Sequence, residues 1–310
     1  MRGHEVRVVA MQWPKRSKHC VVKRLAICAE RVNSLRPDSA DIVCFPEGFL
    51  YAGLAYGHVS EVANQCLPAV KHAEQWAVYL RSHIVLPLIY ERQGRYTNSV
   101  LTFSRSGAVI GHYEKRYPWP SSIDKTELEK GICPGRGSGA VDTDLGRIGV
   151  QTCFDVNWPD GWEELREQRT KLVLFPSEYG GGFALRSRAW QLRAPIIAVI
   201  LGATCRVIDM TGDEATRKYS KSAGHMNIVS LNTNRALVHV DHNEEGLQRL
   251  ARYGSINLRR LSHDNVFLVE VPPSGEHIED ILHACGVREL SAYLSEAHRI
   301  IESKRDRLDS

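Results

Sequence analysis

Residues 146–162 read GRIGVQTCFDVNWPDGW, and this stretch decides how the fold is interpreted. Its first half is an apolar run typical of a buried strand, and the run ends at Cys153. Polar and aromatic residues follow, and Pro159 suits the first turn of a helix predicted over 159–169. The pattern predicts a strand, then a cysteine, then a helix. Such a cysteine is either a small buried side chain or a nucleophile at the end of a strand, and this stretch leaves both open.

Strands and helices alternate along the rest of the chain. Apolar residues at three- and four-residue steps predict further helices, and short apolar runs predict strands. The helices are expected at 18–35, 60–82, 159–169 and 183–194, and the strands at 6–11, 41–45, 84–90, 97–103, 108–113, 147–153, 171–175, 196–203, 205–210, 226–231 and 236–241. Helices that alternate with parallel and hairpin strands indicate a layered α/β sandwich. We expect one domain over residues 1–278, with residues 279–310 as its C-terminal helical extension, broken at Gly286.

Composition narrows the functional classes. The 310 residues are 43% hydrophobic and carry a net charge of +4, as in an ordinary globular protein with a full core. The basic residues form no stripe, so we expect no nucleic-acid partner. No apolar stretch reaches the roughly 18–20 residues that a membrane span needs, and the N-terminus is typical of a first strand rather than a signal peptide. The eight cysteines are spaced singly, which indicates reduced thiols and a cytoplasmic location.

Three reactive side chains follow three predicted strands. Glu47 lies in CFPEGF after the strand 41–45, Lys115 lies in HYEKRYPWP after 108–113, and the third is Cys153. In open α/β sheets, functional groups collect beyond the carboxyl ends of strands. A carboxylate can take the proton of a thiol, the thiolate can attack an electrophilic carbon, and an ammonium can stabilise the resulting oxyanion. Taken singly, the same residues also fit a buried thiol, a turn carboxylate and a solvated lysine.

A family resemblance favours the catalytic interpretation. FPEGF, YEKRYPWP and QTCFDVNWPDG resemble, in this order, the three signatures of the nitrilase superfamily, the carbon–nitrogen hydrolases with a Glu–Lys–Cys triad. The separations, 68 residues from Glu47 to Lys115 and 38 from Lys115 to Cys153, also fit this family, and the similarity extends over about residues 5–270. The resemblance implies a four-layer α-β-β-α sandwich of nitrilase type. It also implies a homodimer or higher homo-oligomer, with no metal and no cofactor.

The chemistry that the resemblance implies is hydrolysis through a thioester. Cys153 would attack an amide-type carbon with Glu47 as the base, and Lys115 and the backbone N–H of Phe154 would bind the oxyanion. Ammonia or an amine would leave, and water activated by Glu47 would release the acid. Many members carry a further glutamate before the cysteine, and KTELEKGICPG offers Glu127 and Glu129, of which we favour Glu129.

The substrate is expected to be a small amide-type molecule. The sequence Cys153-Phe154-Asp155 resembles the amidase and N-carbamoyl branches of the family, whereas nitrile hydrolases typically show Cys-Trp-Glu. Hydrolysis of an amide or N-carbamoyl bond is therefore expected, and nitrile hydrolysis is the alternative. Side chains near the motifs are candidates for lining the substrate site, although ordinary packing would explain them equally well. They are Phe49, Tyr51, Trp119, Asn157, Trp158 and Tyr179.

Other functions fit the sequence less well. In HVDH, His239 and Asp241 would lie on one face of a strand and His242 on the other, so we expect no metal site there. A catalytically silent binding member of the family would have no need of all three reactive residues. A cysteine–histidine protease is conceivable with 13 histidines, but none of them lies in a recognisable signature.

Overall fold

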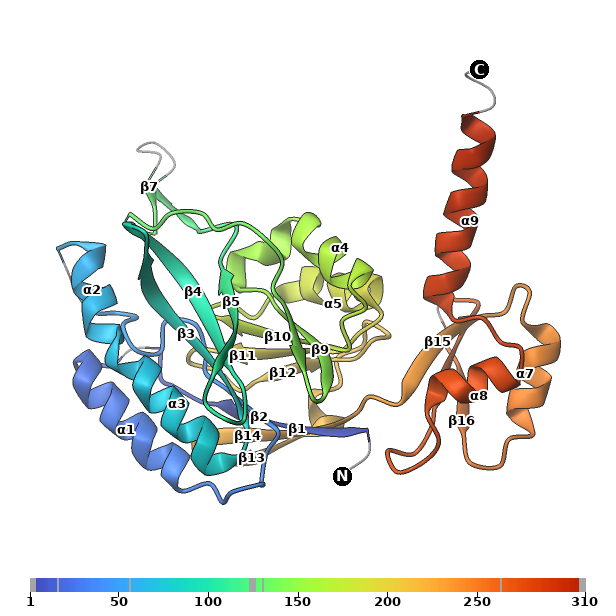
Figure 1. Ribbon diagram of the computed structural model, residues 1–310, viewed down its shortest axis with the longest axis horizontal. Helices are drawn as coiled ribbons and strands as arrows, with labels where there is room; N and C mark the ends of the chain where they lie inside the picture. Colours follow the sequence, from blue (N-terminus) through green and yellow to red (C-terminus); the bar gives the residue numbers. More distant parts are fainter. Residues whose placement is uncertain are drawn as a thin grey trace. The chain divides into compact units, whose positions relative to one another are not determined.

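The computed structural model describes residues 4–15, 17–55, 57–122, 127–129, 131–262 and 264–306. Contacts divide the chain into two compact units, Val6–Leu231 and a smaller one formed by Met1–Glu5 with Asn232–Ser310. The larger unit has the predicted α-β-β-α layers, so the predicted fold class is confirmed (Figure 1).

Two sheets form the middle layers of the larger unit. The seven-stranded sheet has the order β13-β14-β1-β2-β3-β4-β5, and the five-stranded sheet has the order β12-β11-β10-β9-β8. Neighbours β1, β2 and β3 run parallel, as do β9, β10 and β11. The strands are β1 (Glu5–Met11), β2 (Ile42–Cys44), β3 (His83–Arg92), β4 (Arg95–Phe103), β5 (Val109–Glu114), β8 (Ala140–Thr143), β9 (Gly146–Val150), β10 (Leu172–Ser177), β11 (Ile196–Ile200), β12 (Arg206–Ile208), β13 (Ser220–Ala223) and β14 (Met226–Asn232).

The inner core lies between the two sheets. Alternate residues of each strand point inward, as the twofold periodicity of a strand requires. Val8 and Cys44 from the first sheet belong to one buried cluster with Val150 and Leu174 from the second, and all four are fully buried. The strands that carry the candidate residues are therefore held against each other by a continuous apolar layer.

Helices cover the two outer faces. The helices α1 (Val21–Asn33), α2 (Val59–Cys66) and α3 (Pro68–Leu80) pack on the seven-stranded sheet, and α4 (Asp160–Glu167) and α5 (Gly182–Leu192) pack on the five-stranded sheet (Figure 1). The single helix predicted over 60–82 is wrong, because the chain forms α2 and α3 there. Pro68 has no N–H to donate to a preceding turn, so it ends one helix and occupies the first turn of the next.

Over its described residues, the smaller unit holds a three-stranded antiparallel sheet with three helices. Its strands are β15 (Arg235–His239), β16 (Asn257–Arg260) and β17 (Val266–Glu270), and its helices are α7 (Glu244–Ala251), α8 (Ile278–Ala284) and α9 (Leu290–Arg305). Gly286, with φ of 63°, lies between α8 and α9, where the break was predicted. The boundary predicted between 278 and 279 falls at the start of α8, within this unit, and the domain division there stays a prediction.

Four short elements complete the described chain: β6 (Pro120–Ser122), β7 (Glu127–Leu128), the 3-10 helix η1 (Cys153–Asn157) and α6 (Thr216–Tyr219). Within the described ranges, no helix combines the length and the apolar character that crossing a bilayer requires.

Candidate active site

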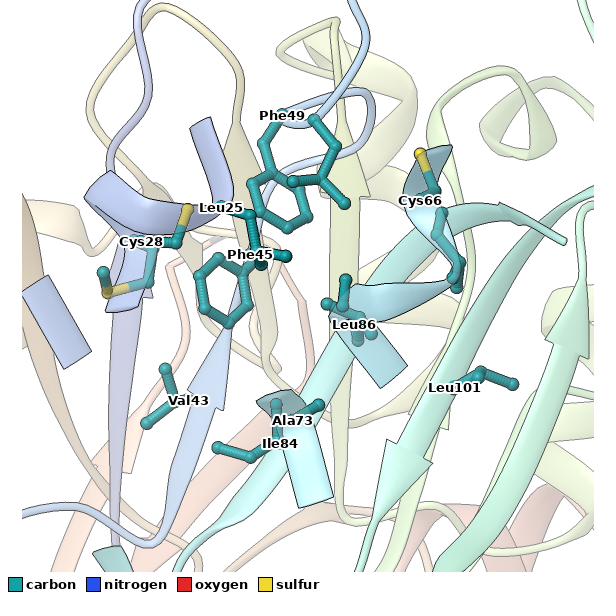
Figure 2. Packing of buried hydrophobic residues seen from close by; sticks show 14 of the residues in the cluster. Leu25, Cys28, Val43, Phe45, Phe49, Cys66, Ala73, Ile84, Leu86 and Leu101 are labelled. Atoms are coloured by element: carbon teal, nitrogen blue, oxygen red, sulfur yellow. The ribbon is translucent and has the colours of Figure 1, made fainter. Parts of the chain in front are cut away.

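Glu47 lies in the turn that follows β2. Phe45 and Phe49 on either side of it are buried, with ring centroids 4.7 Å apart, and they anchor the turn in the core (Figure 2). Gly48 has φ of 72°, a left-handed conformation that glycine adopts without steric cost. A Cβ on Gly48 would lie 2.6 Å from Oε1 of Glu178, so the turn needs glycine for space as well. The turn thereby holds Glu47 in a position where the residue is only 4% exposed.

Lys115 follows β5 and joins two glutamates. Its Nζ donates to Oε1 of Glu47 at 2.8 Å and to Oε1 of Glu129. Its backbone N–H donates to the carbonyl of Asn98, and its carbonyl accepts from the N–H of Gly135, both at 2.8 Å. Burial alone would lower the pKa of Lys115, but the carboxylates of Glu47 and Glu129 outweigh it and raise the pKa. Lys115 is therefore a buried ammonium that stays charged at neutral pH.

Asn98 of β4 bonds the same two glutamates. Its Nδ2 donates to Oε1 of Glu47 at 2.8 Å and to Oε2 of Glu129 at 3.1 Å, and the residue is 2% exposed. Glu129 also accepts from the backbone N–H of Trp119 at 2.7 Å. Of the two glutamates that the sequence offered, the structure brings Glu129 to Lys115, whereas Glu127 lies exposed on β7.

Cys153 lies just beyond β9, at the start of η1. The prediction that this strand continues to Cys153 is wrong, because β9 ends at Val150. The chain turns there because the carboxylate of Asp155 accepts from the N–H of Thr152 at 2.9 Å. Cys153 has φ of 47°, a left-handed conformation that costs a residue with a side chain on the order of 1 kcal/mol or more. Strain of this kind is concentrated at functional sites.

Asp155 ties this turn to the segment that carries Lys115. Its Oδ2 accepts from the hydroxyl of Tyr113 on β5 at 2.8 Å, and its Oδ1 accepts from the N–H of Tyr117 at 2.9 Å. Burial raises the pKa of Asp155 to about 6, although the charge of Lys115 and the hydrogen bonds from Tyr113, Thr152 and Tyr117 oppose the rise. One buried carboxylate thus sets the position of the two segments relative to each other.

The thiol of Cys153 is protonated at neutral pH. Burial raises its pKa to about 12, and the negative charge of Glu47 raises it as well, whereas Lys115 and the hydroxyl of Ser177 oppose the rise. A hydrogen bond with Glu47 acts in the same direction as the charge. The arrangement is that of a neutral thiol beside a carboxylate able to take its proton, rather than that of a resting thiolate.

Glu178 directly follows β10 and adds a third glutamate. Its backbone N–H donates to Oε2 of Glu47 at 3.0 Å. The side chain is half-buried, and burial first and the charge of Glu47 second raise its pKa to about 7, while Lys15 and Lys115 oppose the rise. Both sheets therefore contribute to the surroundings of Glu47.

The predicted substrate-lining residues near Glu47 and Lys115 differ in exposure. Phe49 is fully buried and packs on Phe45, so its side chain belongs to the core. Tyr51 is half-buried, whereas Trp119 and Tyr179 are 52% and 54% exposed.

The remaining predicted residues lie in or beside η1. Trp158 stacks on Tyr117 with ring centroids 4.3 Å apart and meets the ring of Phe154 edge-on at 4.9 Å. Asn157 is exposed, and its Nδ2 donates to the carbonyl of Phe154 at 3.0 Å. These contacts hold the segment after Cys153 in one conformation.

Three residues of this arrangement were not predicted as site residues: Asn98, Asp155 and Glu178. Asn98 lies in a run of three polar residues, Thr97 to Ser99, at the start of a predicted strand, and this run did not distinguish it as a site residue. Glu178 follows the strand predicted over 171–175, and the same kind of position made Glu47 a candidate. Asp155 lay within the quoted motif but served there only to distinguish family branches.

Known proteins share this sequence pattern and fold. The model of the carbon–nitrogen hydrolase family matches residues 5–246. A probable hydrolase of Schizosaccharomyces pombe is 23% identical over 224 residues, which cover 69% of this chain and 79% of that protein. An omega-amidase of Saccharomyces cerevisiae is 26% identical over 167 residues, which cover 50% of this chain and 57% of the omega-amidase. The crystal structure of an amidase from Nesterenkonia sp. superposes with a TM-score of 0.61 at 17% identity, covering 82% of this chain and 97% of that one.

The family match defines the class: the chain is a hydrolase of carbon–nitrogen bonds. It belongs to the carbon–nitrogen hydrolase family, and the predicted family is confirmed. The matched range ends at residue 246, whereas the motifs led us to extend the resemblance to about residue 270.

Proposed function

We propose that this protein hydrolyses an amide or N-carbamoyl bond of a small molecule through a thioester on Cys153. The observation that carries the proposal is the position of Glu47, which is bonded to the ammonium of Lys115 and lies beside the thiol of Cys153. A base, a nucleophile and a fixed positive charge are thus within one buried cluster.

In the first half of the reaction, Glu47 takes the proton from Sγ of Cys153, and the sulfur attacks the carbonyl carbon. Lys115 uses two of its three N–H groups on Glu47 and Glu129, so the third can donate to the oxyanion, together with the backbone N–H of Phe154. The tetrahedral intermediate then collapses, the C–N bond breaks, and protonated Glu47 gives its proton to the leaving ammonia or amine.

In the second half, water attacks the thioester carbon while Glu47 takes one of its protons. The C–S bond breaks, the acid leaves, and Glu47 returns the proton to the thiolate of Cys153. Glu129 and Asn98 act by holding Lys115 and Glu47 in place throughout both halves.

The relatives support amide chemistry over nitrile chemistry. One relative is an omega-amidase, and a superposed structure is an amidase. A variant of the latter with glutamine in place of a glutamate has the acetamide moiety of fluoroacetamide added covalently at its active-site cysteine. We place substrate contacts at Tyr51, Trp119, Asn157, Trp158 and Tyr179, while the burial of Phe49 supports a packing role for that side chain.

Matched amide, N-carbamoyl and nitrile forms of several acyl groups, assayed for ammonia release, test the proposal. We expect turnover of the amide or N-carbamoyl form, and complete loss of it in Cys153→Ala with an unchanged circular dichroism spectrum. Nitriles turned over well above their matched amides would favour a nitrile hydrolase. Turnover of none of the three forms would favour a silent binding member of the family.

We also propose that the protein is a cytoplasmic homodimer or higher homo-oligomer. The family resemblance supports the oligomer, and the eight free cysteines support a reducing compartment. Sedimentation at micromolar concentration tests the assembly, and a single species of 34.9 kDa would reject it. Cell fractionation tests the location.

A further inference from the structure

Glu178 is a carboxylate at the proposed site that the mechanism does not use. Its backbone is bonded to Glu47, and its Oε1 lies so close to Gly48 that a Cβ there would be 2.6 Å away. Within the described part of the chain, no donor is hydrogen-bonded to the carboxylate of Glu178 itself. The carboxylate of Glu178 therefore lies against the turn that carries Glu47, and no hydrogen-bond donor within the described residues is bonded to this carboxylate.

The charges around Glu178 are unbalanced. Lys115 forms ion pairs with Glu47 and Glu129, and it acts on Glu178 only through the electrostatic attraction of its charge. Lys15 acts on Glu178 from an exposed position, and the two form no ion pair. A half-buried carboxylate with neither a hydrogen-bonded nor an ion-paired partner is unfavourable unless a proton or a ligand compensates its charge.

The groups beside Glu178 suit a cation better than an anion. Burial raises the pKa of Tyr51 well above the usual value, and the negative charges of Glu47, Glu129 and Glu178 raise it further. Its phenol thus stays neutral and offers an oxygen acceptor. Tyr179, the next residue, exposes its aromatic ring, and the face of such a ring attracts a positive charge. An anionic group of a substrate would meet repulsion here instead.

We propose that Glu178 is a specificity-determining residue that binds a positively charged group of the substrate. The preferred substrate is then an amide that carries an ammonium or guanidinium group within a few bonds of the scissile C–N bond. The inference rests on the proposed function, since it assigns a substrate class to the same site. An ammonium paired with Glu178 supplies the partner that Lys115 and Lys15 do not.

Three primary amides of equal chain length, ending in an ammonium, a methyl or a carboxylate group, test this inference. For the parent enzyme we expect kcat/KM to be at least tenfold higher for the ammonium amide than for the methyl amide, and lowest for the carboxylate amide. In Glu178→Gln, the ratio of ammonium to methyl amide should fall at least tenfold. Glu167→Gln makes the same chemical change at an exposed position near the end of α4 and should keep the parent ratio.

Calorimetry on the Cys153→Ala protein provides a measurement that does not depend on turnover. We expect the ammonium amide to bind at least tenfold more tightly than the methyl amide, and this preference to disappear when Glu178→Gln is added. If no amide is hydrolysed, the proposed function fails while the calorimetry still decides this inference. Equal kcat/KM or equal affinity for the ammonium and methyl amides would overturn it, as would an unchanged ratio in Glu178→Gln or no measurable binding of the ammonium amide.

Discussion

Replacing Glu47 by glutamine separates two effects that this carboxylate has on Cys153. In the proposed mechanism Glu47 is the base, so Glu47→Gln should lower kcat for hydrolysis at least about 100-fold. Its negative charge also raises the pKa of the thiol, and this effect disappears in the variant. We therefore expect alkylation of Cys153 at neutral pH to become faster although hydrolysis is lost.

The size of the acceleration follows from the pKa of the thiol. With a pKa of about 12, roughly one thiol in 10⁴ is ionised at pH 8, and alkylation of the parent should keep rising with pH up to about pH 11. Removing a nearby like charge lowers a pKa by about 1–2 units, and each unit gives about ten times more thiolate. A thiolate of lower pKa is less nucleophilic, with a Brønsted slope of about 0.4–0.5, so the net gain is about threefold per unit. The expected acceleration is about 3- to 10-fold.

Iodoacetamide labelling between pH 6 and 9, read by peptide mass spectrometry, measures this rate. Peptide resolution is necessary because Cys20 is exposed and Cys133 is half-buried, and Cys153→Ala identifies the signal of Cys153. Thermal unfolding should show that Glu47→Gln is folded. Slower alkylation in Glu47→Gln than in the parent over the whole range would refute the reasoning, because Glu47 would then be activating the resting thiol instead of suppressing its ionisation.

Three further substitutions test the buried cluster. Lys115→Met leaves Glu47 and Glu129 without their shared cation, so hydrolysis should be lost and the free energy of unfolding should fall by about 3–5 kcal/mol in urea denaturation; an unchanged midpoint would contradict the ion cluster. Asn98→Ala removes the donor that both glutamates share, and kcat should fall about 10- to 100-fold with a smaller change in KM, whereas a change in KM alone would contradict a positioning role. The pKa of Asp155 is about 6 in the folded protein against an ordinary 3.8, so between these values the folded state keeps a proton that the unfolded chain has released. Its contribution therefore lowers stability by up to about 3 kcal/mol as the pH rises from about 4 to 6, and denaturation at several pH values should show that this fall is absent in Asp155→Asn.

The sequence by itself determined the layers and the three reactive side chains. Apolar strands that alternate with helices have few ways to bury their surfaces, so the pattern predicts a layered α/β sandwich, and the resemblance to the nitrilase superfamily implied its four layers. Glu47, Lys115 and Cys153 became candidates because each follows a predicted strand, and the resemblance of their motifs to the three family signatures favoured the catalytic interpretation. Both inferences depend on local periodicity and on short sequence motifs, which a chain displays without its tertiary structure.

Only the tertiary structure decided which other side chains meet these three. Glu127 and Glu129 lie two residues apart in one loop, and only the path of that loop brings Glu129 to Lys115. Asn98 and Asp155 are ordinary polar residues in the sequence, and they become important because folding removes water from around them. Asn98 is then bonded to two glutamates, and Asp155 to the hydroxyl of Tyr113 and to two backbone N–H groups. Hydrogen bonds between residues far apart in the chain depend on distance in space, and no periodicity along the sequence encodes that distance.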